Sequence, residues 1–582
     1  MNQFHFLPLA ALLLVVTTES LQAQNDSLDM DVTFVGKRQM EVRDAVKLSS
    51  WPSLRSLPSE KPQLQYDLLS KRLQFDPTMT PVEATRLRVD PSLSRLYRGF
   101  VQAVVGTRGT TLLDASYTDL RSRDGSWGTA LHHAATASPS SLLDGRLNAN
   151  EIEAWGSRFL GKEKVDVNVR AGQSKTLLYG FDSLAVDSAL STMDAPQVTW
   201  KHLGGDVSFK SHHKDSTDLN HEVHMTLGWL SNDRNTQERH FLTEAMGSKY
   251  IGNEKLEVSA TMQLDRYQLD TEGASNQAVV TLNPRLVSRR GAWTASVGLG
   301  LAIDADQPSR DNIGESFHLY PRAHVSVNLL RNLFVPYAQL GGELQANNFH
   351  SLLRDNPFFA PSALESPVYI NAQRVDATGF RSTNKRLALS GGVRGTITEV
   401  FRFHGYFSTA QYEDYLLYTP VIDAQGFTEF EAVYDTLGMR TIGGEASFDL
   451  GDSWSFAGGM QLNSYTVRTE DRPWHLPKVA WNASASYKVI EGLKVSADVR
   501  YVGERFAVSQ SDSYGETTSL GDGRYELRLP GFLDLNLSAN YRYNDRLGAS
   551  FALANIANAR YANWGGYPVQ GIQALAGVQY AF

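Results

Sequence analysis

The sequence predicts an all-β membrane protein, an antiparallel transmembrane β-barrel of about 22 strands that follows a short, extended periplasmic segment. Three observations predict this fold. Segments of alternating apolar and polar residues follow one another from Arg98 to Phe582, the connections between them alternate between short and long, and the chain ends on such a segment. Because side chains on a strand alternate between its two faces, each segment gives the sheet one apolar face.

The first 23 residues have the composition of a secretory signal peptide. An apolar run from Phe6 to Val16 is too short to cross a bilayer as a helix but suits the apolar region of a signal, and Ala23 is the expected cleavage position. Beyond this run the sequence holds no stretch of about 18 apolar residues, so a membrane prediction depends on strands. We therefore expect an exported protein whose mature chain begins at residue 24.

Residues 24–97 differ from the rest of the chain by their prolines. Six prolines in 74 residues oppose long helices and central strands, because proline fixes φ and lacks an amide donor. We expect an extended periplasmic segment that precedes a barrel at residues 98–582. The segment starts with "LDMDVTFVGKRQ", an apolar stretch that could add a strand to the edge of a partner's sheet.

The stretch "GFLDLNLSANYRYNDRLGASFAL" shows the alternation of the predicted strands most clearly. Leu533, Leu535 and Leu537 share one face, whereas Asp534 and Asn536 share the other, and the pattern resumes after a tight turn. An apolar sheet face must be buried against protein or lipid. We expect it to contact lipid, while the polar face lines a wet lumen.

The predicted connections have the alternating lengths of an up-and-down barrel, which has short periplasmic turns and longer extracellular loops. The short ones are predicted at 161–163, 213–218, 252–254, 289–291, 330–332, 397–399, 451–453, 490–492 and 544–546. The long ones are predicted at 138–150, 174–196, 304–315, 350–385, 416–431, 468–476, 508–524 and 559–570. A short hairpin at residues 107–108 departs from this scheme.

Composition excludes several classes of protein. The net charge of −8 provides no basic excess for binding nucleic acid, and a mean hydropathy of −0.30 does not suit a bundle of membrane helices. Cysteine is absent, which excludes disulfide frameworks, thiol catalysis, cysteine-ligated zinc and a lipid anchor on cysteine.

Three stretches resemble a known family. "FALANIANARYANWGGYPVQGIQALAGVQYAF" resembles the closing strands of TonB-dependent outer-membrane receptors, and "LLRDNPFFAPSAL" followed by "LALSGGVRGTITEVFRFHGYFS" resembles another part of such barrels. "MDVTFVGKR" is similar to the TonB box, the segment that pairs as a strand with the energy-transducing protein TonB. The resemblance implies location in the outer membrane, and its implied TonB contacts are Asp31, Val32, Thr33, Phe34 and Val35.

The closing strand, "GIQALAGVQYAF", ends on a terminal phenylalanine, as a bacterial outer-membrane barrel is expected to do. We interpret Val578, Tyr580 and Phe582 as its assembly face, with the barrel-assembly machinery as partner.

One departure from the family concerns the plug, a folded domain that TonB-dependent receptors carry between box and barrel. The 74 residues before the barrel are too few for it, and "VTFVGKRQMEVRDAVKLSSWP" resembles the start of plug-less relatives from Bacteroidota. The largest natural barrels are plugged, so inward loops, the proline-rich segment or another protein should fill the lumen.

Candidate metal and catalytic residues are few. His212, His213, His221 and His224 flank one predicted turn and could approach a divalent metal, but polar rim residues are the more ordinary interpretation. The stretch "DADQPSRD" (304–311) offers oxygen ligands without the glycine and glutamate of a calcium loop, so we expect solvated acidic residues. We predict no metal, cofactor or catalytic site.

Three functions remain open from the sequence. The first is a receptor-like transporter for a bulky nutrient, driven through the TonB box; the second is a non-transporting barrel that scaffolds an envelope complex, with a surface lipoprotein as one possible partner. The third, an enzyme, is not what we predict. Acidic residues of predicted outer loops suggest cationic or metal-bearing ligands, although acidic loops also serve solubility; they are Asp304, Asp306, Asp311, Glu429 and Glu431.

Overall fold

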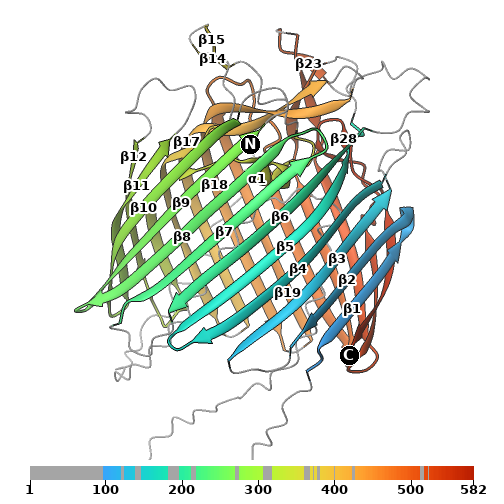
Figure 1. Cartoon of the computed structure of the whole chain (residues 1–582), viewed down its shortest axis with the longest axis horizontal. Coiled ribbons are helices and arrows are strands. Elements are labelled where there is room, and N and C mark those ends of the chain that lie inside the picture. The colour runs from blue at the N-terminus through green and yellow to red at the C-terminus, as the bar shows by residue number, and fades with distance from the viewer. Residues whose placement is uncertain are drawn as a thin grey trace, which may run out of the picture. The chain divides into compact units, whose positions relative to one another are not determined.

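The strands of the barrel form one antiparallel sheet that closes on itself, because the last strand of the chain pairs with the first (Figure 1). The computed structural model describes residues 96–119, 124–137, 146–180, 196–211, 218–268, 274–305, 317–359, 368–370, 373–375, 380–398, 400–422, 427–451, 453–510, 517–521 and 523–582. Within these residues the sheet has 22 strands. Closure leaves no unpaired sheet edge. The predicted all-β barrel of about 22 strands is confirmed.

The barrel strands have the following bounds. They are β1 (Gly99–Gly106), β2 (Thr110–Thr118), β3 (Gly125–Ala137), β4 (Arg146–Leu160), β5 (Glu163–Leu177), β6 (Gln197–Ser211), β7 (Asn220–Asn232), β8 (Gln237–Ile251), β9 (Glu254–Gln268), β10 (Ala274–Arg290), β11 (Trp293–Ala305), β12 (Phe317–Val327), β13 (Val335–Gln345), β16 (Thr383–Ile397), β17 (Phe401–Ile422), β18 (Thr428–Leu450), β19 (Trp454–Val467), β20 (Val479–Ile490), β21 (Leu493–Val502), β25 (Phe532–Arg542), β26 (Leu547–Ala554) and β29 (Gln573–Ala581).

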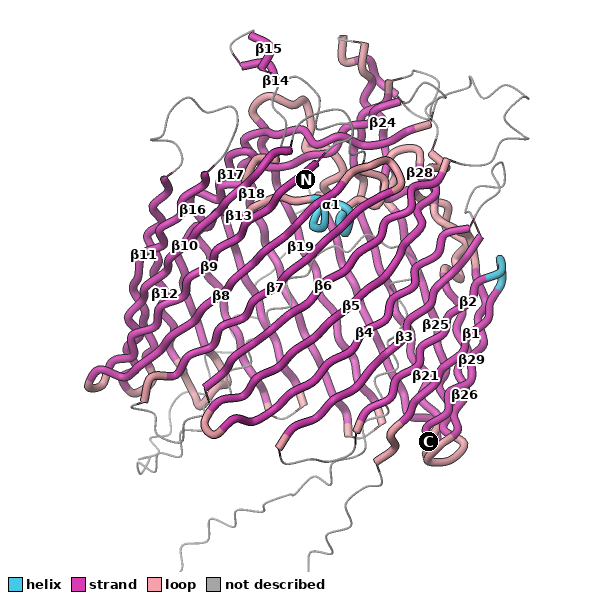
Figure 2. Tube along the Cα trace, viewed as in Figure 1, coloured by secondary structure: helices cyan, strands magenta, loops and turns pink. Residues whose placement is uncertain are grey.

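The remaining described elements belong to the connections (Figure 2). They are a 3-10 turn (Thr107–Gly109), the helix α1 (Phe349–Asp355), β14 (Val368–Ile370), β15 (Gln373–Val375), β22 (Arg505–Ser509), β23 (Thr517–Ser519), β24 (Tyr525–Leu529), β27 (Ala562–Trp564) and β28 (Tyr567–Pro568). In the described part of the chain, no helix has the length and apolar character needed to cross a bilayer.

The predicted short connections lie at one end of the barrel and the predicted long ones at the other, but the long-connection end also carries short connections between β7 and β8 and between β9 and β10. The short-turn end also holds both ends of the barrel sequence, where the amide of Arg98 donates to the carbonyl oxygen of Phe582 at 2.8 Å. In outer-membrane barrels the short turns are periplasmic, and the opposite end is extracellular.

One predicted long connection is wrong. Residues 416–431 were expected to form a loop, but β17 and β18 continue to pair from Leu416 opposite Tyr434 to Ile422 opposite Thr428. The hairpin is extended because its side chains gain partners from distant connections: the ring of Tyr418 lies 4.9 Å from that of Trp564.

The outward face of the barrel is apolar and exposed. On β25, Leu533 and Leu537 are exposed while Asp534, between them in the alternation, is buried. The outer surface of β7 and β11 likewise carries Leu227 and Val297, both more than half exposed. These side chains would be unfavourable in water, so the exterior is a lipid-contacting band, as the sequence predicted.

The lumen is wet near the short turns and filled near the long connections. Glu238, on β8, contacts α1 and therefore faces the inside of the barrel. Glu244 and Met246 lie on the same face of β8, nearer the short turns, and are exposed. Buried large side chains gather instead at the long-connection end, in a set we call the mouth cluster. It contains Leu177, Leu178, Tyr179, Val198, Trp200, Leu230, Tyr267, Phe349, Leu352, Phe358, Phe359, Phe380, Tyr418, Phe427, Phe430, Trp564 and Tyr567.

Candidate functional site

The connection between β13 and β16 folds into the long-connection end of the barrel. We call two of its described stretches, 346–359 and 380–382, the mouth segment. It carries α1, which lies within the outline of the barrel in Figure 2. The ring of Phe349 lies 5.8 Å from Tyr267 on β9, and that of Phe359 lies 6.3 Å from Tyr418 on β17. The mouth segment therefore contacts the wall at two separate places, β9 and the extended end of β17.

Local sequence explains why a helix begins at residue 349. Asn348 is the N-cap: its side chain accepts from the amide of Ser351 at 2.8 Å, and the Ser351 hydroxyl accepts from the amide of Asn348 at 3.1 Å. This reciprocal pair satisfies amides that the first helical turn leaves without partners. Phe349 and Leu352, three residues apart, then share the buried face of the helix.

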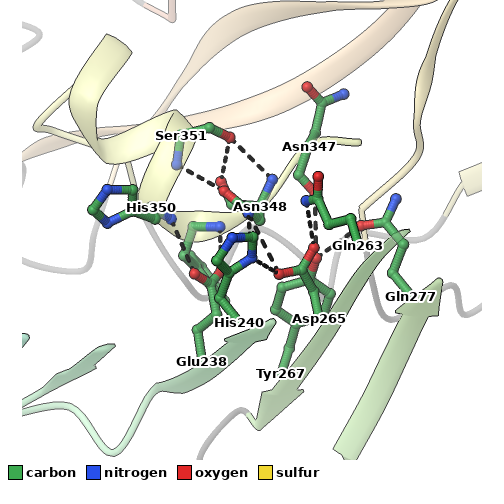
Figure 3. A network of polar contacts seen from close by, with 11 residues as sticks. Glu238, His240, Gln263, Asp265, Tyr267, Gln277, Asn347, Asn348, His350 and Ser351 are labelled. Carbon is green, nitrogen blue, oxygen red and sulfur yellow. Dashed lines mark hydrogen bonds and ion pairs between the residues drawn. The ribbon is translucent and has the colours of Figure 1, made fainter. Parts of the chain in front are cut away.

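The barrel wall supplies a second cap to the same helix (Figure 3). The carboxylate of Glu238, on β8, accepts from the amide of Phe349 at 2.5 Å and from the amide of His350 at 3.3 Å. Glu238 is only 2% exposed. A buried carboxylate is costly unless it is hydrogen-bonded, and a helix N-terminus favours negative charge. The position of α1 is therefore tied to one wall residue.

Asp265 on β9 connects a second group of contacts in Figure 3. Its carboxylate lies 2.6 Å from Nδ1 of His240 and accepts from the side-chain amides of Gln263 at 2.7 Å and Asn348 at 3.4 Å. Three donors around one buried carboxylate balance its desolvation. The N-cap residue is thus itself held by the wall.

A third contact joins the mouth segment to β9 and β10. The hydroxyl of Tyr267 lies 2.8 Å from Oε1 of Gln277 and 3.2 Å from the carbonyl oxygen of Asn347. The side-chain amide of Gln277 donates to the Ser382 hydroxyl at 2.9 Å. Both described ends of the mouth segment are therefore bound to neighbouring strands of the wall.

Other connections complete the mouth cluster on the far side. Asp435 of β18 accepts from the backbone amides of Arg468, Thr469 and Glu470 at 2.9 to 3.2 Å, which fixes the connection after β19. That connection places His475 between the rings of Phe430 and Trp564. Burial, with Arg505 nearby, lowers the pKa of His475 to about 3, so the imidazole is neutral at ordinary pH.

The mouth segment and the connections around it close the lumen at the long-connection end. The mouth segment combines apolar packing with polar contacts to the wall. These polar contacts are concentrated on a few wall residues: Glu238, Asp265, Tyr267 and Gln277.

Of the four histidines considered as metal ligands, the two that the structure describes have different acidic partners. His221 lies 3.3 Å from Glu163 and His224 lies 3.6 Å from Asp206, while His212 and His213 lie outside the described residues. The described residues contain no group of three or more histidine, aspartate or glutamate side chains placed to hold a metal.

Among the acidic loop residues, Glu429 is buried and paired with Arg234 at 2.5 Å, and Glu431 accepts from Thr419 at 3.2 Å. Asp304 is buried, and Asp306 and Asp311 lie outside the described residues. The TonB-box-like residues 31–35 also lie outside them.

The predicted assembly face is well placed. Val578, Tyr580 and Phe582 all point outward from the barrel and are exposed. The ring of Phe582 lies where a side chain at Gly99 would stand, so glycine permits the closing strand to seat against β1.

Sequence reasoning missed Glu238 and Asp265. Both lie at polar positions in strands whose residues alternate between apolar and polar, as many other lumen-facing residues do. The available signal was the capping pattern Asn348 to Ser351 next to "LLRDNPFFAPSAL", which marks an ordered helix inside a long connection.

Comparison with known proteins identifies the fold. A scan of protein-family models and a search of curated proteins found no match. Solved structures do match: the FrpB iron transporter from Neisseria meningitidis (F3-3 variant) has a TM-score of 0.61 at 12% identity, covering 84% of this chain and 82% of that one. The siderophore receptor PirA from Acinetobacter baumannii has 0.63 at 10% identity, covering 84% and 81%.

The copper transporter OprC matches with a TM-score of 0.59 at 12% identity, covering 83% of this chain and 80% of that chain. At such identities the likeness is one of fold. The barrel expected from the resemblance is therefore confirmed as a fold, and this chain shares that fold with proteins described as an iron transporter, a siderophore receptor and a copper transporter.

Proposed function

We propose that the protein takes up a bulky nutrient across the outer membrane through its barrel, and that the mouth segment is the gate. The observation that carries the proposal is a wet lumen of 22 strands, closed at its extracellular end by a segment held through a few wall residues. Support comes from the shared fold with iron, siderophore and copper transporters. Passage requires the gate to move, and its wall contacts are polar bonds that can be exchanged for water.

A locked gate tests this proposal. The chain has no cysteine, so the double variant His240→Cys and Asn348→Cys carries only the two introduced thiols; the native side chains at these positions are 3.4 Å apart. A short bifunctional thiol reagent that a reductant can cleave should join wall and gate. In planar bilayers containing potassium chloride, we expect the cross-linked barrel to conduct less than the same barrel after reduction.

A matched control cross-links the wall without touching the gate. Ser126 and Ser157 lie on neighbouring strands, with hydroxyl oxygens 2.8 Å apart. The Ser126→Cys and Ser157→Cys barrel should conduct equally before and after reduction. If the His240→Cys and Asn348→Cys barrel conducted equally before and after reduction, the mouth segment would not act as a gate.

We further propose that residues 31–35 couple the barrel to TonB by strand addition. A strain without the protein, grown on single nutrient sources, should fail on the nutrient that the barrel imports. The full chain should restore that growth, a chain lacking residues 31–35 should not, and a chain lacking the equally short stretch 53–57 should. Unchanged growth on every nutrient, with loss of a co-purifying partner, would favour an envelope scaffold instead.

A further inference from the structure

Four aromatic rings lie side by side on the inner wall near the short turns. They belong to His324 on β12, Tyr337 on β13, and His404 and Tyr406 on β17. Successive ring centroids are 6.2, 5.7 and 5.1 Å apart, and successive ring planes differ by 26°, 33° and 25°. The rings thus form a continuous row of roughly parallel, offset aromatic side chains along strands that are about 4.8 Å apart.

Glycines make this arrangement possible. Tyr337, Gly392, Tyr406, Gly443 and Gln461 face each other in register across five neighbouring strands, so large and absent side chains alternate. A methyl group at Gly392 would stand 3.0 Å from the Tyr337 ring, and one at Gly443 would stand 2.3 Å from the Tyr406 ring. Each phenol ring therefore lies flat over its neighbouring glycine.

The four rings face the lumen. Along these strands the outward positions are held by exposed apolar residues such as Phe407, Ile442 and Leu462. Tyr406, Gly443 and Gln461 alternate with them and point inward. All four rings are half-buried, as expected for rings with one face on the wall and the other in water.

Polar groups of both signs border the rings. Arg394 and Glu445 flank His404 directly in register, one on each side. Among the described residues neither forms a hydrogen bond or ion pair, and Arg394 is exposed. Gln461 donates to the Tyr406 hydroxyl at 2.9 Å, and the Tyr337 hydroxyl lies 2.8 Å from Nε2 of His404. The border thus offers an uncommitted donor and an uncommitted acceptor beside flat ring faces.

We propose that this platform binds a neutral oligosaccharide. A sugar ring presents a C–H face that packs on aromatic rings and a rim of hydroxyls, each both donor and acceptor. An aromatic anion would also stack, but Glu445 would oppose the attraction that Arg394 offers it, whereas the hydroxyls of a neutral sugar can use both groups. The inference rests on the proposed function because it names the substrate class of that transport.

The test measures saturation transfer by NMR from the purified full chain to maltohexaose, cellohexaose and xylohexaose. The protein is held in a detergent without a sugar headgroup, and naphthalene-2-sulfonate serves as the aromatic anion. We expect transfer to at least one oligosaccharide. Tyr406→Ala should weaken its binding about tenfold or more, as truncation of a contacting aromatic residue does.

Two glycine variants separate the platform from a general effect on the barrel. Gly443→Ala should displace the Tyr406 ring and weaken binding. Gly405→Ala, next to both His404 and Tyr406, meets nothing within 4 Å and should leave binding unchanged. Absence of transfer to all three sugars, transfer to the sulfonate alone, or full binding by both Tyr406→Ala and Gly443→Ala would overturn the proposal.

Binding by purified protein requires neither TonB nor gate movement. If cross-linking of the gate did not change the conductance while sugar binding still required Tyr406, the gate would therefore be refuted. The sugar-binding platform would remain supported.

Discussion

Glu238 shows how one lumen-facing residue determines the position of a distant helix. Its buried carboxylate accepts two amides from the first turn of α1, more than a hundred residues later in the chain. The rest of the lumen face of β8 is wet, and Glu244 there is exposed. Identical side chains on one strand face thus have different roles, which depend on what folds against them.

We predict that Glu238→Gln loosens the gate. Glutamine keeps one acceptor, but its NH₂ group faces backbone donors and leaves one of them without a partner, so docking of α1 should weaken by about 1 to 3 kcal/mol. Hydrogen exchange of residues 349–355 should become faster. Glu244→Gln, on the same strand face, is the control and should leave that exchange unchanged. Equal protection in Glu238→Gln would show that apolar packing alone holds the helix.

His475 makes the stability of the closed mouth cluster depend on pH. Its pKa is lowered to about 3 when folded and is near 6.5 when its surroundings open, so the open state binds a proton that the closed state does not. Stability from the neutral imidazole is present above pH 6.5 and is lost as the pH falls toward 3, by at most about 1.4 kcal/mol per pH unit.

We predict that His475→Asn removes this dependence. The backbone at residue 475 has a φ of +63°, which asparagine adopts more readily than most residues. After correction for intrinsic exchange, amides of residues 468–478 should lose protection between pH 7.5 and 4.5 in the native protein. The variant should lose less. A native protein with the same protection at both pH values would contradict this account.

At the scale of single elements, the closing strand β29 joins the two ends of the barrel sequence. It pairs with β26 on one side and β1 on the other, and Phe582 exchanges backbone hydrogen bonds with Gly99. Its outward side chains are exposed rather than packed within the barrel, as the predicted assembly role requires.

We predict that Phe582→Ala lowers the amount of folded barrel in the outer membrane while Phe551→Ala does not. Both phenylalanines are outward and about half exposed, so they lose similar lipid contact, but Phe551 lies on β26 and not at the chain terminus. Heat-dependent migration on gels measures the folded fraction. Equal losses in the two variants would mean that the assembly role of Phe582 is no more than its contact with lipid.

The strands were predictable because alternation is a local signal. The short turns followed as well, since glycine with positive φ at residues 161, 252, 291 and 451 marks them. The extension of β17 and β18 was not predictable: Pro420 and Gly426 suggest a loop, and the pairing is supported by contacts with residues such as Trp564, far along the chain.

The candidate site was hidden for a related reason. Sequence indicated that inward loops were one of three possible fillings of the lumen, but not which polar wall positions would receive them. Asp265 has the same alternation as any lumen residue; its role comes from His240, Gln263 and Asn348 meeting it in space. Contacts made across the lumen produce no periodic pattern in the sequence.

At the scale of the whole molecule, the barrel separates lipid outside from water inside. Salt bridges such as Arg170 to Asp206 and Arg285 to Glu257 lie on the inner face, at 2.5 and 2.6 Å. Val169 and Leu286, next to Arg170 and Arg285 in the alternation, are exposed on the outer face. One face of each strand is thus suited to lipid and the other to water, which orients the barrel across the membrane.

Arginine substitution on opposite faces of β7 tests this separation directly. Leu227 lies near the middle of the strand, outward and 60% exposed, so Leu227→Arg should place a charge in hydrocarbon and cost about 2 to 4 kcal/mol. His224 points into the lumen beside Asp206, and His224→Arg keeps a cation near that carboxylate, so we expect little change. Urea titration of the barrel refolded into lipid bilayers, with folding read from heat-dependent migration, measures both. If the two variants were equally stable, the outer face of β7 would not lie in hydrocarbon, and the gate and the sugar platform would lose the membrane channel that gives them a purpose.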